Sequence, residues 1–161
     1  MKRLWAPWRL EFIKSARLGK NKCIFCEKPE EKKDDENYIL FRGRKNFVIL
    51  NIFPYNNGHL MVSPYRHLSS MDEMTDEELL ENFMLVAKFS SLIKKEFNAD
   101  GFNIGINLGK TAGAGFEHVH THVVPRWNGD SNYMPVIAGV KVMPELLSST
   151  YEKLKNALKQ A

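Results

Sequence analysis

Hydrophobic and polar positions alternate over several short stretches of the chain, which is the pattern of half-buried β-strands. The stretches rich in β-branched or aromatic residues are residues 38–43, 47–52, 59–64, 101–107 and 117–125. Turn-forming residues separate the first three, at Gly43 and in the sequence PYNNG before His59. We therefore predict an antiparallel meander, which the last stretch closes.

A helical period replaces this alternation between Thr75 and Phe97. The apolar residues at helical spacing are Leu79, Leu80, Phe83, Val86, Ala87, Phe89, Leu92, Ile93 and Phe97. Thr75 and Glu78 form a T-x-x-E sequence, which is typical of a capping box. This predicts a long amphipathic helix with its aromatic and methionine side chains in the core. A second helix is predicted from Pro144 to Gln160.

These elements predict an α+β fold, with a five-stranded antiparallel sheet, one long helix and terminal helices. A length of 161 residues suits a single domain with a substantial core. We predict that residues 1–36 form an N-terminal arm and CxxC loop, residues 37–125 the core, and residues 126–161 a C-terminal loop and helix. The charged segment EKPEEKKDDEN has no apolar period, so we expect a mobile loop there.

The composition favours a soluble protein that acts on a small ligand. No apolar run approaches the ~20 residues that span a bilayer, and the N-terminus lacks the apolar core of a secretory signal. We therefore expect a cytoplasmic protein without a membrane partner. The net charge of +4 and the pI of about 9.0 come from scattered basic residues. This distribution favours a small anion over a nucleic acid polymer.

Three histidines occupy every second position of the sequence EHVHTHVVP, residues 117–125. On a strand, His118, His120 and His122 would share one face, each ~6.6 Å from the next. A single histidine is usually a hydrogen-bonded or surface residue, but three in register favour a chemical role. We predict that His120 is a nucleophile and that His122 protonates the leaving group. Either His118 or a backbone carbonyl would fix the tautomer of His120.

The glycine-rich sequence GKTAGAG precedes the histidines, at residues 109–115. Consecutive backbone N–H groups with little side-chain obstruction suit phosphate oxygens, and Lys110 adds a positive charge. Such glycine segments are often simple loops, and this one is not a Walker motif. Beside the histidine row, however, it indicates that the nucleophile attacks phosphorus.

The sequence HVHTHVV resembles the signature of the histidine triad (HIT) family of nucleotide hydrolases and transferases, with Thr121 where that pattern usually has an apolar residue. The resemblance extends to CIFC, NIFPYNNGHLMVSPYRH and NLGKTAGAG. WAPWR, AGAG and HVVPRWNGDSNYMPV resemble the branch with bacterial diadenosine tetraphosphate phosphorylases and hydrolases. The resemblance implies that His120 attacks the α-phosphorus of a dinucleoside polyphosphate. A nucleotidyl-histidine intermediate would form, which phosphate or water resolves.

The resemblance also implies residues that bind the substrate. Asn51 matches a ribose-contacting position, Ile52 and Phe53 would wall the base, and His59 matches a pocket histidine. The positions that match phosphate-holding residues are Asn107, Gly113, Ala114, Gly115 and Phe116. Without the resemblance, turn or strand-end hydrogen bonding would be the better interpretation of both asparagines. Family members form dimers by joining two five-stranded sheets, so a homodimer or a larger homo-oligomer is implied.

Cys23 and Cys26 are the only cysteines, in the sequence CIFC. This spacing indicates a metal site, a redox dithiol or no role, and the βαβ context of a redox motif is missing. His67 and His118 would complete a Cys₂His₂ set for zinc, and zinc-bearing members of the resembled family place ligands at such positions. We expect a structural zinc that positions the N-terminal loop and the histidine strand. A catalytic zinc is the alternative.

Several rival functions stay open. Phosphorolysis and hydrolysis both fit the residues, and a nucleoside phosphoramidate hydrolase would cleave a P–N bond with the same triad. A zinc-stabilised nucleotide-binding module without turnover is a third reading, although a binder has no use for His120 and His122 together. A metal hydrolase of the His-x-His type is disfavoured, because Glu117 is the only carboxylate beside the triad.

Overall fold

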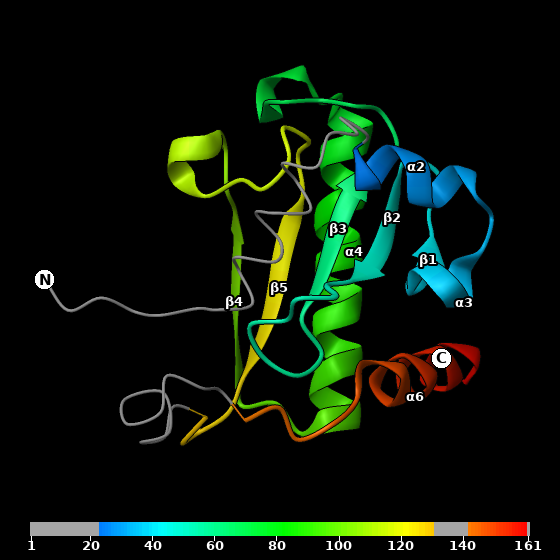
Figure 1. Ribbon diagram of the computed structural model, residues 1–161, viewed down its shortest axis with the longest axis vertical. Coiled ribbons are helices and arrows are strands. Elements are labelled where there is room, and N and C mark those ends of the chain that lie inside the picture. Colours follow the sequence, from blue (N-terminus) through cyan, green and yellow to red (C-terminus); the bar gives the residue numbers. More distant parts are fainter. Residues whose placement is uncertain (1–22, 131–141, 161) are drawn as a thin grey trace, which may run out of the picture.

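The computed structural model describes residues 23–130 and 142–160. The predicted N-terminal arm up to residue 22 and most of the predicted C-terminal loop lie outside the described residues. Five strands form one antiparallel sheet, which confirms the α+β prediction (Figure 1). The strands are β1 (Ile39–Arg42), β2 (Asn46–Leu50), β3 (Leu60–Pro64), β4 (Gly101–Ile106) and β5 (Thr121–Arg126).

The sheet order is β1-β2-β3-β5-β4, which differs from a simple meander in the last two strands. β5 lies between β3 and β4, so that His122 pairs with Met61 on one side and with Gly105 on the other. A long helix joins β3 to β4 in the chain. β4 therefore does not lie beside β3 but on the far side of β5. The histidine strand therefore occupies an inner position of the sheet rather than its edge.

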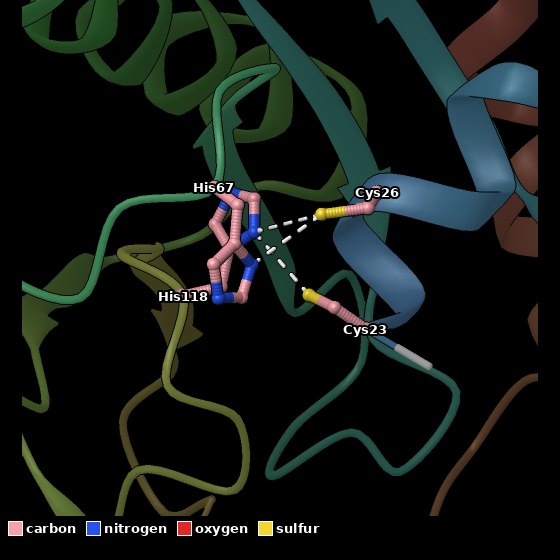
Figure 2. Close-up of side chains that lie close together, drawn as sticks. All are labelled: Cys23, Cys26, His67 and His118. Carbon is pink, nitrogen blue, oxygen red and sulfur yellow. Dashed lines mark hydrogen bonds between the residues drawn. The ribbon is translucent and has the colours of Figure 1, made fainter. Parts of the chain in front are cut away.

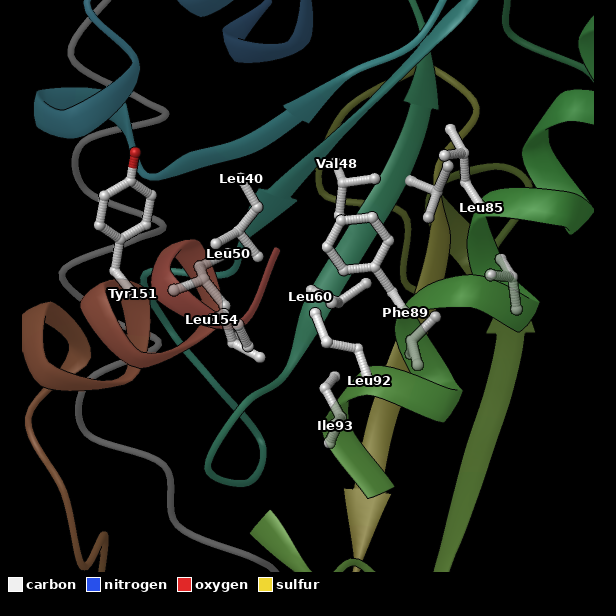
Figure 3. Close-up of a cluster of buried hydrophobic side chains, with 14 of the residues drawn as sticks. Leu40, Val48, Leu50, Leu60, Leu85, Phe89, Leu92, Ile93, Tyr151 and Leu154 are labelled. Atoms are coloured by element: carbon white, nitrogen blue, oxygen red, sulfur yellow. The ribbon is translucent and has the colours of Figure 1, made fainter. Parts of the chain in front are cut away.

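Helix α4 (Asp76–Phe97) lies against one face of the sheet, where α6 (Leu147–Lys159) packs beside it (Figure 3). Its predicted start is confirmed, because the Thr75 hydroxyl accepts from the Glu78 N–H and the Glu78 carboxylate accepts from the Thr75 N–H. Among the described residues, no helix combines the length and apolar character that a membrane span needs.

The prediction that all aromatic and methionine side chains of α4 are core is wrong at two positions. Phe83 is 51% exposed and Met84 is 62% exposed, and the neighbouring Leu80 is 65% exposed. Phe89 and Ile93, on the side that faces the sheet, are fully buried. The apolar stripe of α4 is thus wider than the sheet that it covers, which leaves an apolar surface exposed.

The opposite face of the sheet carries the N-terminal segment, where the prediction of a mobile loop is wrong. Residues there form α2 (Ile24–Glu30) and α3 (Asp34–Asn37). Phe25 is buried against Phe47, Ile49 and Met61 of the sheet. Phe25 is the one buried aromatic ring of these two short helices, so the charged segment has no apolar period and gave no helical signal.

Candidate active site and metal centre

The histidine row lies on the sheet face opposite α4. β5 begins at Thr121, so the prediction of a strand over residues 117–125 is too long at its start. The predicted shared face is nevertheless present: His122 pairs with Met61, which packs with Phe25, while Thr121 points toward α4. His120 is 4% exposed, and its ring centroid lies 4.8 Å from that of His122. Although His120 precedes the strand, its imidazole therefore lies on the same side of the sheet as that of His122.

A backbone hydrogen bond fixes the tautomer of His120. The Nδ1 atom of His120 lies 2.6 Å from the carbonyl oxygen of His118, and a carbonyl oxygen only accepts. Nδ1 therefore carries the hydrogen, and Nε2 presents its lone pair. Burial lowers the pKa of His120, against the effect of that hydrogen bond, which favours a neutral ring near pH 7. A neutral imidazole with a free Nε2 is a nucleophile.

A second chain of hydrogen bonds fixes the tautomer of His122. The Tyr55 N–H donates to Nδ1 of His59 at 3.0 Å, so the hydrogen of that ring is on Nε2. Nε2 of His59 donates to Nδ1 of His122 at 3.0 Å, which leaves the His122 hydrogen on Nε2. Burial, with repulsion from neighbouring histidines, lowers the pKa of His59 to about 3 and that of His122 to about 4. His122 is thus a neutral imidazole that presents an N–H group, with its ring centroid 4.8 Å from that of His120.

The family resemblance implied that His59 is a pocket residue, but sequence reasoning missed its contact with His122. The two residues are 63 positions apart, and no local pattern joins them.

Thr121, the departure from the family pattern, has a buried polar partner. Its hydroxyl donates to the Asn82 side chain on α4 at 2.7 Å, and Asn82 donates to Asn46 of β2 at 3.0 Å. All three side chains are almost fully buried. The hydroxyl thus joins β5 to α4 from the face opposite the imidazoles, and no sequence signal indicated this network.

Two of the predicted nucleotide-binding residues, Asn51 and Phe116, have side-chain contacts with nearby residues. The side-chain oxygen Oδ1 of Asn51 accepts from the Phe53 N–H at 2.9 Å, which is the turn bonding that composition alone suggests. Phe53 itself is 38% exposed and Ile52 is 45% exposed, so both offer apolar surface. The ring of Phe116 packs edge-on against Phe25, with 6.0 Å between centroids.

The glycine-rich loop forms a 3-10 turn, η2 (Lys110–Ala112), directly after β4. Gly113 ends this turn with a φ of 96°, a conformation that favours glycine. A Cβ at Gly113 would lie 3.9 Å from the Asn107 side-chain nitrogen, so the loop folds back over the end of β4. Lys110 pairs with Glu117 at 3.6 Å on the surface. Ala114 and Gly115 follow in the same loop.

Figure 2 shows Cys23, Cys26, His67 and His118 converging on one point. Their ligand atoms all lie within 4.8 Å of one another. The sulfur atoms lie 3.3 Å (Cys23) and 3.6 Å (Cys26) from Nδ1 of His118, and Cys26 lies 3.4 Å from Nδ1 of His67. A tetrahedral zinc with ordinary bond lengths separates sulfur and nitrogen by roughly 3.5 Å. The geometry of the set therefore fits zinc.

Local structure explains how these four side chains meet. Cys23 is the N-cap of α2 and Cys26 lies one turn later, so both face the same side. The ring of His118 donates from Nε2 to the Pro64 carbonyl at 3.0 Å, which leaves the lone pair of Nδ1 toward the sulfurs. Burial, opposed by this bond, lowers the pKa of His118 to about 4. His118 is thus neutral, as a metal ligand must be.

The cysteines also have the chemistry of metal ligands. Burial, and then the neighbouring Cys23, raise the pKa of Cys26 to about 11. A divalent cation between the sulfurs would offset this penalty and hold both as thiolates. Two sulfurs and two imidazole nitrogens are a donor set typical of structural zinc.

Comparison with known proteins agrees with this geometry. The model of the HIT domain matches residues 32–129. An AP-4-A phosphorylase from Mycobacterium tuberculosis (strain ATCC 25618 / H37Rv) is 40% identical over 158 residues, which cover 93% of this chain and 80% of that protein. An asymmetrical bis(5'-nucleosyl)-tetraphosphatase from Schizosaccharomyces pombe is 35% identical over 57% of this chain and 50% of its own.

Solved structures resemble the fold as well. A Zn-bound histidine triad family protein from Mycobacterium smegmatis superposes with a TM-score of 0.71 at 26% identity, over 88% of this chain and 96% of that one. The family model covers more than half of the chain and includes His120 and His122. The chain therefore belongs to the family of HIT domain proteins.

Proposed function

We propose that this protein is an enzyme that cleaves dinucleoside polyphosphates, of the diadenosine tetraphosphate type, at the α-phosphorus through a nucleotidyl-His120 intermediate. The observation that carries the proposal is the pairing of tautomers, with a lone pair on Nε2 of His120 beside a hydrogen on Nε2 of His122. The similarity to an AP-4-A phosphorylase over 93% of the chain supports the substrate class.

In the first step, Nε2 of His120 attacks the α-phosphorus and forms a P–N bond. The bond between that phosphorus and the bridging oxygen breaks, and the nucleoside polyphosphate leaves as an anion whose oxygen accepts a hydrogen bond from the Nε2–H of His122. His59, whose Nε2–H holds Nδ1 of His122, keeps this donor in the correct tautomer. Two buried, neutral imidazoles thus divide the roles of nucleophile and hydrogen-bond donor to the leaving group.

In the second step, inorganic phosphate or water attacks the nucleotidyl-histidine and releases His120. With diadenosine tetraphosphate, phosphate would give ADP and ATP, whereas water would give AMP and ATP. We propose that Asn107 and the backbone of Gly113, Ala114, Gly115 and Phe116 hold the phosphate oxygens, because the left-handed turn leaves this backbone open. Asn51 would contact the ribose, and Ile52 and Phe53 the base.

We further propose that Cys23, Cys26, His67 and His118 hold one structural zinc. Four protein ligands would fill a tetrahedral site and leave no position for a substrate. The metal, when bound, would cross-link α2 to the two segments that carry the histidines. His118 contributes to both the Cys/His cluster and the histidine row, since its ring faces the sulfurs while its carbonyl oxygen accepts the hydrogen bond of His120. The zinc-bound relative supports the choice of metal.

We propose that two copies associate through β4 and α4. Among the described strands β4 is an edge, and Ile104 on it is 47% exposed. Ile104 pairs with Val123, whose side chain packs in the core beneath α4, so Ile104 lies on the same sheet face as α4. Phe83 and Met84 on α4 extend this apolar surface. Sedimentation of the purified protein tests the dimer, and a monomer at micromolar concentration would contradict it.

The central experiment incubates the protein with diadenosine tetraphosphate and labelled inorganic phosphate. Label in ADP establishes phosphorolysis, and unlabelled AMP establishes hydrolysis. Acid-quenched samples are examined for nucleotidylated protein at His120. Cleavage of a nucleoside phosphoramidate without cleavage of the dinucleotide would favour the P–N rival, and binding without any intermediate would favour the non-catalytic module.

A further inference from the structure

Phe25 lies between the two cysteines of CIFC, yet its ring contacts the histidine row. The side chain is 1% exposed and stacks on the ring of His120, with 4.6 Å between centroids and 25° between planes. It also lies 5.3 Å from the ring of His118. One turn of α2 thus supplies two sulfurs to the metal cluster and an aromatic face to His120.

The hydrogen bond from Nδ1 does not by itself fix the orientation of the His120 ring. The bond from Nδ1 to the His118 carbonyl fixes one atom, but the ring can still rotate about that contact and swing Nε2 away. His122 meets the His120 ring edge-on, at an interplanar angle of 75°. Phe25 covers the ring in a stacked arrangement, so rotation of the imidazole would push it against a buried aromatic face.

We propose that Phe25 is a positioning residue, which holds the His120 imidazole with Nε2 toward the phosphorus and so couples the cysteine turn to the nucleophile. This inference rests on the function proposed above. Phe25 does not take part in bond making. An enzyme whose nucleophile is displaced by a fraction of an ångström still binds its substrate. The chemical step is slower, because attack requires close alignment.

The test uses a matched pair of substitutions in one cluster, Phe25→Leu and Phe47→Leu. Phe47 is also fully buried, 6.5 Å from Phe25, and its ring stacks on Tyr65. Both variants lose one buried aromatic ring, but Phe25→Leu alone removes the ring stacked on His120. We expect Phe25→Leu to lower kcat and the single-turnover rate of nucleotidylation about tenfold, with KM and metal content near wild type. Phe47→Leu should keep kcat within about twofold of wild type.

A second measurement needs no substrate. Nitrogen-15 spectra of the histidine side chains distinguish two states of the ring. A ring whose Nδ1–H stays bonded to the His118 carbonyl has separate Nδ1 and Nε2 signals, whereas a ring that leaves this bond exchanges its proton between the two nitrogens and the signals converge. We expect separate His120 signals in the wild type and in Phe47→Leu, and convergence in Phe25→Leu. Phe25→Met, which keeps an apolar side chain of similar size, replaces Phe25→Leu if the latter loses metal.

The two measurements separate the inference from the function on which it rests. Convergence of the His120 signals only in Phe25 variants, in a protein that forms no nucleotidyl intermediate, would support positioning and reject the proposed reaction. Equal kcat losses in the two leucine variants, with unchanged His120 signals, would overturn the inference while the reaction stands.

Discussion

The histidine row and the Cys/His cluster share His118 but are built in different ways. In the row, His120 and His122 are separated by one residue, and their ring centroids lie 4.8 Å apart. The cluster gathers a helix N-terminus at Cys23, a loop residue at His67 and a residue before β5 at His118. Local geometry makes the row, and only the folded sheet makes the cluster.

The two regions also use their histidines differently. In the row, burial keeps the imidazoles neutral, and hydrogen bonds decide which ring nitrogen has the lone pair and which has the hydrogen. In the cluster, the ring of His118 points its lone pair at two sulfurs. The row should therefore govern reaction rate, and the cluster should govern stability.

The largest effect is expected from removal of the nucleophile. His120→Ala should abolish turnover, by several orders of magnitude, while substrate binding persists, because the proposed phosphate-binding loop is intact. Single-turnover cleavage and equilibrium titration measure the two properties. Activity within tenfold of wild type would contradict the assignment of the row to catalysis.

Loss of His122 should have a smaller effect that depends on the leaving group. His122→Ala should slow cleavage of a dinucleotide by about 10²–10⁴-fold and cleavage of a substrate with an activated aryl leaving group far less, because that group departs readily without a hydrogen bond from the protein. The ratio of the two kcat values is the measurement. Equal losses on both substrates would show that His122 does not assist the leaving group.

The cluster should respond in stability before activity. Cys23→Ser should lower metal content from about one zinc per chain, and the midpoint of thermal unfolding should fall on the order of 10 °C, with a smaller change in kcat. Elemental analysis of protein purified without a polyhistidine tag measures the metal. Wild-type protein without metal, or with freely reactive native thiols, would show that the cluster is not a zinc site.

Acidification should destabilise the folded protein through the buried histidines. The pKa values of His59 and His122 are lowered to about 3 and about 4, so below pH 6.5 the unfolded chain binds protons that the folded one does not. The free energy of unfolding should therefore fall as pH drops from about 6.5 toward 4. Urea titrations at each pH measure it, and His122→Gln should flatten the dependence.

The smallest effect is expected at Thr121, which joins the row to α4. Thr121→Val leaves Asn82 without its buried donor, at a cost of about 1–2 kcal/mol in the free energy of unfolding. Activity should change little, because the hydroxyl faces away from the imidazoles. A double-mutant cycle with Asn82→Ala isolates the pair, and additive effects would exclude the coupling.

The sequence was a reliable guide wherever a short period carried the information. Alternation located the strands, helical spacing with Thr75 and Glu78 located α4, and the spacing of His120 and His122 placed them on one face. It failed for the charged segment that forms α2 and α3, because Phe25 is a single anchor without a period. It also failed for Phe83 and Met84, since their burial depends on what covers them.

The sequence by itself determined which residues alternate and therefore which side chains share a face, because that follows from the geometry of an extended backbone. Tertiary structure alone decided that His59 sets the tautomer of His122, that Phe25 covers His120, and that β5 lies between β3 and β4. These contacts join residues dozens of positions apart. They exist only once the sheet has brought distant segments together, so no local pattern encodes them.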